Sequence, residues 1–112
     1  MRGILITGAG KGIGYECAKY FSNNRDFKVL ILIRSKSDLK KFKKFKNVIF
    51  FIGDVKKKKN INQIFNYANK KKIIIDRLIN NAGIRQRKKF IDIKSEEINE
   101  VLNTNFFSIF FI

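Results

Sequence analysis

The sequence predicts an α/β fold in which a doubly wound parallel sheet of about four strands is connected by crossover helices. Four short runs rich in Ile, Val, Leu and Phe are nearly continuous rather than alternating, as in strands buried on both faces of a parallel sheet. The segments between these runs carry apolar residues at helical spacing. Because strand and helix alternate, right-handed βαβ units are expected, and 112 residues suffice for one domain.

The first predicted strand covers Gly3–Thr7, and a glycine-rich turn follows it. The next segment carries Ile13, Cys17 and Phe21 at intervals of four residues, which predicts a helix with one apolar face. The second and third predicted strands cover residues 28–33 and 48–52.

Two more helices and the fourth strand complete the predicted sheet region. Leu39, Phe42 and Phe45 recur at every third residue, and this repeat predicts a helix between the second and third strands. Another helix is expected over residues 61–68, where apolar residues follow the i, i+3, i+4, i+7 pattern. The fourth strand is expected at Ile73–Ile79.

A last helix is expected to begin at Ser95, because serine is a good N-cap and two glutamates follow it. The next position on its apolar stripe is Asn105, so a polar residue is expected on the buried face. The stripe itself is Ile98, Val101 and Leu102. The sequence stops at Ile112 within this helical pattern, so we expect an incomplete sheet domain over residues 1–112, truncated at its C-terminal end.

The formal net charge of +16 raises the possibility of a nucleic-acid-binding protein. Lys outnumbers Arg by 19 to 6, whereas recognition of bases and phosphates favours the Arg fork. The lysine runs also border the predicted elements, as solvated faces do. We therefore expect no specific nucleic-acid partner, and only a general attraction to polyanions at low salt.

No apolar stretch reaches the ~20 residues that a membrane helix needs, and the apolar part of the first residues is too short for a secretory signal. We therefore expect no membrane partner. The single cysteine, Cys17, cannot form an internal disulfide, which favours a cytoplasmic protein. No metal site is predicted.

Four of the seven glycines lie between Gly8 and Gly14, after a strand and at the start of a helix. In that setting the first backbone amides of the helix have no partner, and the helix dipole adds positive potential. Glycine also lets a ligand approach the backbone closely. The pattern predicts a pyrophosphate site, and the alternative is a tight strand-to-helix turn without a ligand.

The run from Thr7 to Gly14 resembles T-G-x-x-x-G-I-G of the short-chain dehydrogenase/reductase family, which uses NAD(P) on a Rossmann-type sheet. Three further motifs follow in the order and at the spacing of that family: Asp54 after the third strand, Asn80-Asn81-Ala82-Gly83 after the fourth, and Asn103-Thr104-Asn105 in the last helix. The resemblance covers the whole chain.

The resemblance implies a set of cofactor-binding residues. They are Thr7, Gly8, Lys11, Gly12, Ile13, Gly14, Arg34, Ser35, Asp54, Val55, Asn81, Ala82 and Gly83. Taken singly, Asp54 is also compatible with a turn, residues 81–83 with a strand-end turn, and Asn105 with a satisfied core amide.

The end of the second strand indicates which cofactor is used. Members of the family that use NAD carry Asp at the position of Ile33, and Arg34 follows it here, with Lys11 in the glycine turn nearby. Two cations and the hydroxyl of Ser35 suit a 2′-phosphate. We therefore predict a preference for NADP(H), with NAD(H) possible. The alternative is that Arg34 and Lys11 are ordinary exposed cations.

The family transfers hydride with a Tyr as general acid/base, a Lys four residues later, a Ser, and a helix Asn that orders a water. Only Asn105 matches by position. Two literal Y-x-x-x-K pairs, Tyr15 with Lys19 and Tyr67 with Lys71, are rejected as catalytic. Tyr15 adjoins the glycine turn rather than the nicotinamide end, and Tyr67 falls in a crossover helix.

The resemblance therefore implies an NADP(H)-dependent oxidoreductase that acts on a small carbonyl or alcohol. This chain would be a fragment without the catalytic Tyr and Lys, inactive alone, from a parent expected to form homo-oligomers. One alternative is a non-catalytic dinucleotide-binding module or subunit, and another is a polyanion-binding protein. The basic segment 85–89 is either a solvated loop or an attractor of anionic substrates.

Overall fold

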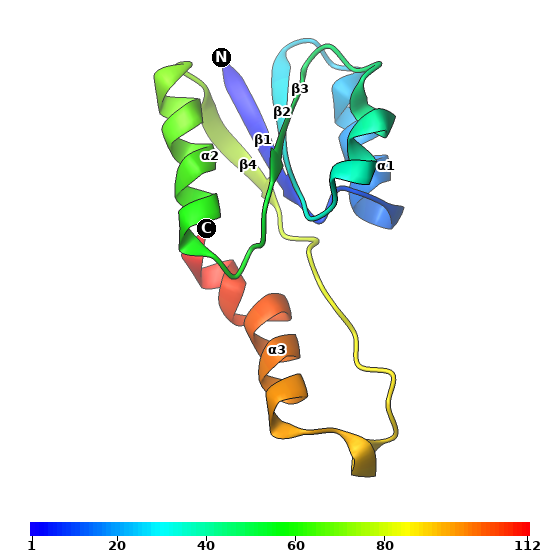
Figure 1. Cartoon of the computed structure of the whole chain (residues 1–112). Coiled ribbons are helices and arrows are strands. Elements are labelled where there is room, and N and C mark those ends of the chain that lie inside the picture. The colour runs from blue at the N-terminus through cyan, green and yellow to red at the C-terminus, as the bar shows by residue number, and fades with distance from the viewer.

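A computed structural model describes every residue of the chain, 1–112. Four strands form one parallel sheet in the order β3-β2-β1-β4 (Figure 1). They are β1 (Arg2–Thr7), β2 (Phe27–Ile33), β3 (Val48–Ile52) and β4 (Ile74–Ile79). The predicted α/β class and parallel sheet are therefore confirmed. The chain winds from β1 outward to β3 and then crosses back to β4, so the winding reverses beside β1, as in doubly wound sheets.

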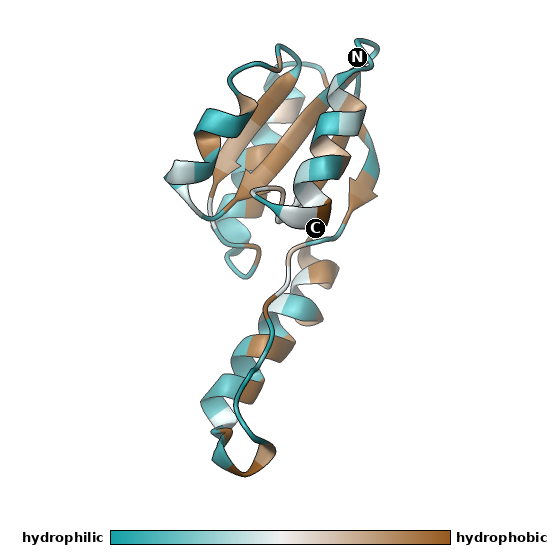
Figure 2. Ribbon diagram, turned by 90° about the vertical axis from the view of Figure 1, so that its right-hand side faces the viewer, coloured by the Kyte–Doolittle hydropathy of each residue, from teal (hydrophilic) through white to brown (hydrophobic).

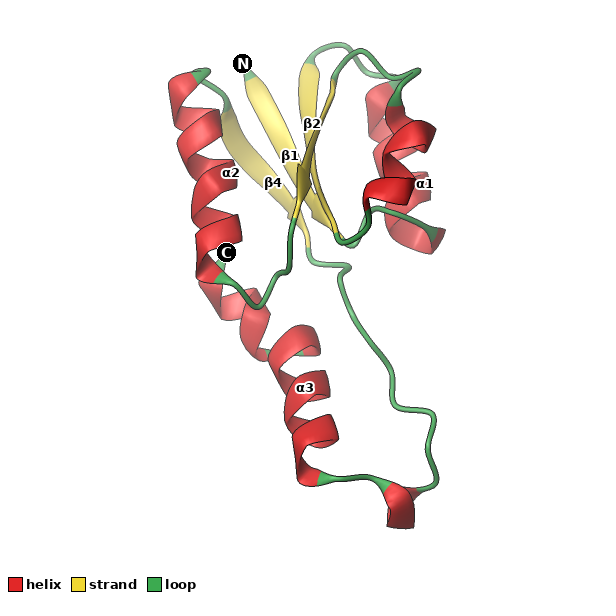
Figure 3. Cartoon of the chain, in the orientation of Figure 1, coloured by secondary structure: helices red, strands yellow, loops and turns green.

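Helices cover both faces of the sheet, as Figures 1 and 3 show in one orientation. Helix α1 (Gly12–Ser22) and the 3-10 helix η1 (Lys36–Phe42) pack on one face, and helix α2 (Lys58–Lys70) packs on the other. Alternate residues of each central strand supply the two cores. In β1, Ile4 and Ile6 face α1, whereas Leu5 faces α2.

The two central strands and the two outer strands differ in burial. Residues Val29–Ile33 of β2 are buried on both faces, as predicted. The same prediction is wrong for the outer strands, because Phe50 of β3 is 49% exposed and Ile74 of β4 is 68% exposed. Each outer strand has only one neighbouring strand, and the helices do not cover all of its surface.

The segment predicted as a helix around Leu39, Phe42 and Phe45 forms the 3-10 helix η1 instead. A repeat of three residues is the period of a 3-10 helix rather than of an α-helix. Phe42 is buried in the core beside α1, and its two companions pack against the same core from partly buried positions.

The C-terminal segment extends away from the sheet, which gives the molecule extents of 49 × 24 × 21 Å (Figure 2). After the short 3-10 helix η2 (Phe90–Asp92), it contains helix α3 (Ser95–Asn105) and the 3-10 helix η3 (Phe107–Phe111). The α-helix thus ends before Ile112, in contrast to the prediction that the chain stops inside it. No helix of the chain has the length and apolar character needed to cross a membrane.

The predicted start of α3 at Ser95 is confirmed, but the predicted cap and the predicted burial of this helix are wrong. Ser95 is the first residue of the helix rather than its cap, and the carboxylate of Glu97 instead accepts a hydrogen bond of 3.0 Å from the amide of Lys94. The predicted buried stripe is also largely exposed, with Ile98 at 46%, and Asn105 is exposed, whereas Thr104 is buried. The reason is that α3 lies beyond the sheet, so the sheet does not cover the stripe (Figure 2).

Candidate functional site

The glycine turn joins β1 to α1 and uses two of its glycines for their backbone conformation. Gly8 has φ of +65° and Gly12 has φ of +61°, a region that residues with a Cβ atom adopt at a cost. A Cβ at Gly12 would meet no atom within 4 Å. Glycine is therefore required at position 12 by the backbone conformation and not by crowding.

The other two glycines leave room for neighbouring atoms. A Cβ at Gly14 would come closer than 3.0 Å to the carbonyl oxygen of Gly8 and to Nδ2 of Asn81. A Cβ at Gly10 would come equally close to Oδ2 of Asp38. The turn is thus packed tightly against the segment that follows β4 and against η1.

Backbone amides at the start of α1 are free to bind a ligand. Inside α1 the first amide to reach a carbonyl is that of Tyr15, which donates to the oxygen of Lys11 at 3.4 Å. The amides of Gly12, Ile13 and Gly14 donate no hydrogen bond within the chain. Together with the positive end of the helix dipole and the exposed ammonium of Lys11, they form an anion-binding arrangement.

The end of β4 is tied to the glycine turn by polar contacts. The hydroxyl oxygen of Thr7, itself 1% exposed, accepts hydrogen bonds of 3.1 Å from the amides of Asn81 and Ala82. The side-chain amide of Asn81 donates to the carbonyl oxygen of Gly8 at 3.0 Å. These bonds satisfy buried polar groups and bring residues 81–83 beside the turn.

The end of β2 contributes Arg34 and Ser35, both exposed, followed by η1. The ammonium of Lys41 donates to the carbonyl oxygen of Gly10 at 2.7 Å and to Oδ1 of Asp38 at 3.0 Å. This end of the sheet therefore combines one exposed Arg with an acidic side chain that is paired with a Lys.

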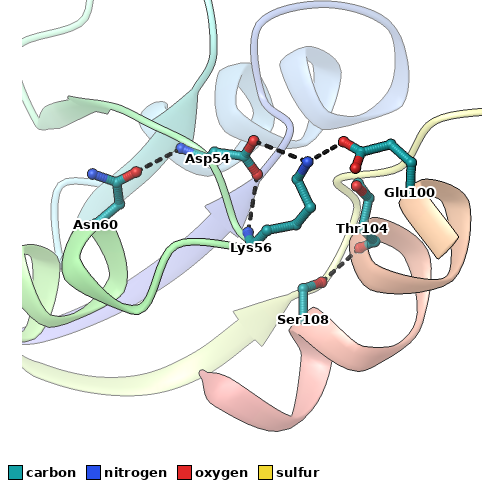
Figure 4. A network of polar contacts seen from close by, with 6 residues as sticks. All are labelled: Asp54, Lys56, Asn60, Glu100, Thr104 and Ser108. Atoms are coloured by element: carbon teal, nitrogen blue, oxygen red, sulfur yellow. Dashed lines mark hydrogen bonds and ion pairs between the residues drawn. The ribbon is translucent and has the colours of Figure 1, made fainter. Parts of the chain in front are cut away.

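The end of β3 carries a polar network that reaches α3 (Figure 4). The amide of Asp54 donates to Asn60 at 2.8 Å, and its carboxylate accepts from the amide of Lys56 at 2.9 Å. The ammonium of Lys56 lies between this carboxylate, at 3.6 Å, and that of Glu100. The hydrogen bond to Glu100 raises the pKa of Lys56, and desolvation opposes this effect. Ser108 donates to the carbonyl oxygen of Thr104 at 2.6 Å.

These strand ends surround one cleft of about 520 Å³, at the carboxyl edge of the sheet. Nine of the predicted cofactor residues line it: Gly8, Lys11, Arg34, Ser35, Asp54, Val55, Asn81, Ala82 and Gly83. Ligands of doubly wound sheets bind at this edge, where the winding reverses. The structure therefore brings together predicted residues from four separate segments of the chain: the glycine turn, the end of β2, the end of β3 and the end of β4.

The remaining predicted residues lie beside the cleft. Thr7 lies beneath it, and Gly12, Ile13 and Gly14 form the start of α1. In Asn105, Oδ1 accepts a hydrogen bond of 2.7 Å from the amide of Ile84, and Nδ2 donates to the carbonyl oxygen of Ile84 at 2.6 Å. The side chain of Asn105 thus holds the segment that follows residues 81–83.

Sequence reasoning missed seven residues that line the cleft: Gly10, Leu32, Ile33, Asp38, Gly53, Ile84 and Thr104. Four of them lie within or next to the motifs described above: Gly10, Ile33, Ile84 and Thr104. Their closeness to those motifs in the sequence is a signal that could have identified them. No such signal exists for Asp38, because the only pattern in its segment is the apolar repeat that begins at Leu39.

Neither Y-x-x-x-K pair contributes to the cleft. The ring of Tyr15 packs against Phe42 with centroids 5.5 Å apart, and the ring of Tyr67 packs against Phe51 at the same separation. Both tyrosines are absent from the cleft lining. The residues that are present fit an elongated anionic ligand, since free amides and cations meet along a concave edge.

A family model described as short chain dehydrogenase matches residues 2–112. The chain is also 34% identical over 110 residues to the 3-oxoacyl-(acyl-carrier-protein) reductase FabG of Buchnera aphidicola subsp. Baizongia pistaciae. That alignment covers 96% of this chain and 45% of the reductase. The chain therefore spans about half the length of the curated relatives that it matches.

Solved structures with nicotinamide dinucleotides resemble the chain. The structure of ElxO with NADP bound has a TM-score of 0.83 at 32% identity and covers 98% of this chain and 46% of its own. The structure of 4-hydroxyisoleucine dehydrogenase complexed with NADH has a TM-score of 0.82 at 26% identity, with coverage of 99% and 46%. The similar structures thus include both an NADP and an NADH complex.

Proposed function

The chain belongs to the short chain dehydrogenase family, and we propose that it is the NADP(H)-binding part of an oxidoreductase for small carbonyl or alcohol substrates. The observation that carries the proposal is the single cleft that unites the glycine turn, the end of β2, Asp54 and residues 81–83. Together they supply free backbone amides, cations and polar side chains at the carboxyl edge of a parallel sheet, where dinucleotides bind.

Each part of the cleft has a distinct binding task. The free amides at the start of α1 hold the pyrophosphate, and Asp54 with Val55 holds the adenine. Residues 81–83 are anchored by Thr7 and Asn81 and support the path toward the nicotinamide. Bound NADP(H) supplies the hydride chemistry.

The proposed preference for NADP(H) rests on a cation at the end of β2 and another in the glycine turn. Arg34 and Lys11 line the cleft with the hydroxyl of Ser35, while Ile33 occupies the place where an acidic residue would bind the ribose of NAD. Charge-assisted hydrogen bonds from such cations stabilise a 2′-phosphate. NAD(H) lacks that phosphate and is expected to bind more weakly.

A binding titration of NADPH and NADH against Arg34→Gln tests this preference. We expect the affinity for NADPH to fall about 10- to 100-fold, because a hydrogen bond to a charged group is worth ~1.5–3 kcal/mol. The affinity for NADH should stay within about twofold. Arg85→Gln is the matched control, since Arg85 is exposed and lies outside the cleft lining. Equal losses for both nucleotides would contradict the preference.

We also propose that the 112-residue chain does not catalyse hydride transfer by itself, because neither of its Tyr–Lys pairs lines the cleft. The same observation favours a second candidate, a dinucleotide-binding module or subunit without catalysis. Asn105 would contribute to the oxidoreductase only through its place beside Ile84. We place the protein in the cytoplasm and its parent enzyme in a homo-oligomer, without a metal or a specific nucleic-acid partner.

A further inference from the structure

An acidic side chain lines the cleft beside the cations that attract a phosphate. Asp38 belongs to η1, and Arg34 and Lys11 line the same cleft. Its Oδ2 lies where a side chain at position 10 would be, since a Cβ at Gly10 would come closer than 3.0 Å to it. The missing side chain of Gly10 therefore makes room for this carboxylate.

Lys41 holds the carboxylate in this place from outside the cleft. Its ammonium donates to Oδ1 of Asp38 at 3.0 Å and to the carbonyl oxygen of Gly10 at 2.7 Å. It also lies 5.7 Å from the ring centroid of Tyr15. Lys41 does not line the cleft, so its contacts with the cleft residues are those to Asp38 and Gly10. We call Asp38 and Lys41 the η1 ion pair.

We propose that the η1 ion pair sets the preference of the cleft between NADPH and NADH, with Lys41 neutralising Asp38 so that Arg34 and Lys11 attract the 2′-phosphate unopposed. The proposal rests on the proposed function. An unpaired carboxylate repels a dianionic phosphate, whereas carboxylates of this fold accept a hydrogen bond from a ribose hydroxyl. Removal of Lys41 therefore shifts the cleft toward the nucleotide without the phosphate.

The pair is positioned for this role by burial as well as charge. The side chain of Asp38 is 19% exposed and that of Lys41 is 40% exposed, so the carboxylate is the better shielded partner. Charges near a protein surface interact through an intermediate dielectric, so we expect moderate effects that salt reduces. Arg34 remains the direct partner of the phosphate, and the η1 ion pair adjusts the field around it.

The test compares four forms of the full chain: unsubstituted, Lys41→Met, Asp38→Asn, and the double variant. Dissociation constants for NADPH and NADH are measured at low salt. Lys41→Met should bind NADPH about fivefold more weakly relative to NADH, because it leaves a net negative charge. Asp38→Asn should move the ratio about fivefold the other way. The double variant should restore the ratio within about twofold, because both charges are gone.

A merely structural role predicts a different pattern. In that case all three variants weaken NADPH and NADH equally, the ratio stays constant, and the proposal is overturned. Lys41→Arg should keep the original ratio. Asp38→Asn preserves side-chain volume, so it decides the question if Lys41→Met fails to fold by circular dichroism. If the unsubstituted chain binds neither nucleotide, the proposed function itself fails, whereas binding with an unchanged ratio overturns only the role of the η1 ion pair.

Discussion

The sheet region, residues 1–79, buries the apolar residues of its central strands. The C-terminal region, residues 80–112, leaves most of its large apolar residues exposed. Ile31 of β2 is 0% exposed, whereas Leu102 of α3 is 43% exposed although it lies on an equally regular apolar stripe. The apolar pattern thus determines which element forms, but burial requires a surface opposite the stripe. In the sheet region helices and strands face one another, and α3 extends past the sheet (Figures 1 and 2).

Directional polar contacts connect the two regions, alongside apolar contacts of Ala82 and Ile112 with the core beneath α2. Thr7 binds the amides of Asn81 and Ala82, and Lys56 pairs with Glu100. Within the C-terminal region, Asn105 holds the backbone of Ile84. Directional bonds can position residues 81–83 at the cleft even though the segment beyond them buries little apolar surface. The sheet region therefore supplies most of the stability, and these bonds align the site.

The largest expected effect comes from a large-to-small substitution in the core of the sheet region. Ile31→Ala should lower the free energy of unfolding by about 2–5 kcal/mol, because a buried Ile leaves a cavity. Leu102→Ala should change it by less than about 0.5 kcal/mol, as for exposed positions. Urea denaturation followed by circular dichroism measures both. Similar losses at the two positions would show that the C-terminal region has a buried core of its own.

Removal of the Thr7 hydroxyl tests the connection between the regions and should have an intermediate effect. Thr7→Val keeps the shape of the side chain but leaves the amides of Asn81 and Ala82 without their acceptor. We expect a loss of about 1–3 kcal/mol in unfolding free energy, which is the cost of an unsatisfied buried donor, together with weaker nucleotide binding. Thr7→Ser retains the oxygen and is the control. A Val variant as stable and as tight-binding as the Ser variant would refute this role.

The parts of the fold that sequence predicts well are those decided by local pattern. The strands were recognisable from β-branched runs, and the run from Gly8 to Gly14 from its place between a strand and a helix. Its individual glycines were not separable, since positive φ at Gly8 and Gly12 and crowding at Gly14 depend on the neighbouring strand end. The local sequence pattern identifies the motif, and the tertiary structure shows why a glycine stands at each of these positions.

The parts that sequence missed depend on surfaces far away in the chain. The repeat of Leu39 and Phe42 predicts a helix, and a period of three belongs to a 3-10 helix. The apolar stripe of α3 predicts burial, but periodicity does not reveal whether another surface faces it. Asp38 was missed because its significance comes from Gly10, which is distant in sequence and has no side chain to signal a contact.

The smallest expected effect concerns the first turn of α3 and its dependence on pH. A hydrogen bond from Lys88, followed by one from the amide of Lys94, holds the pKa of Glu97 below its usual value of 4.5. A lowered pKa means that the ionised form is favoured in the folded chain, so its contribution is present above the unfolded pKa and is lost as pH falls through the folded one. The first turn of α3 should therefore open more often below about pH 4.5. The opening of β2 should not depend on the ionisation of Glu97.

Amide hydrogen exchange, corrected for its intrinsic pH dependence, resolves these two regions separately. Protection of the α3 amides should decline on acidification, while that of residues Val29–Ile33 should not change with the ionisation of Glu97. Glu97→Gln removes the titrating group and should flatten the response of α3. A response that persists in this variant would place its origin elsewhere, for example at Asp76, whose pKa is lowered by a hydrogen bond from Arg2. Loss of protection in β2 together with α3 would show that the two regions open as one unit, against the division drawn between them.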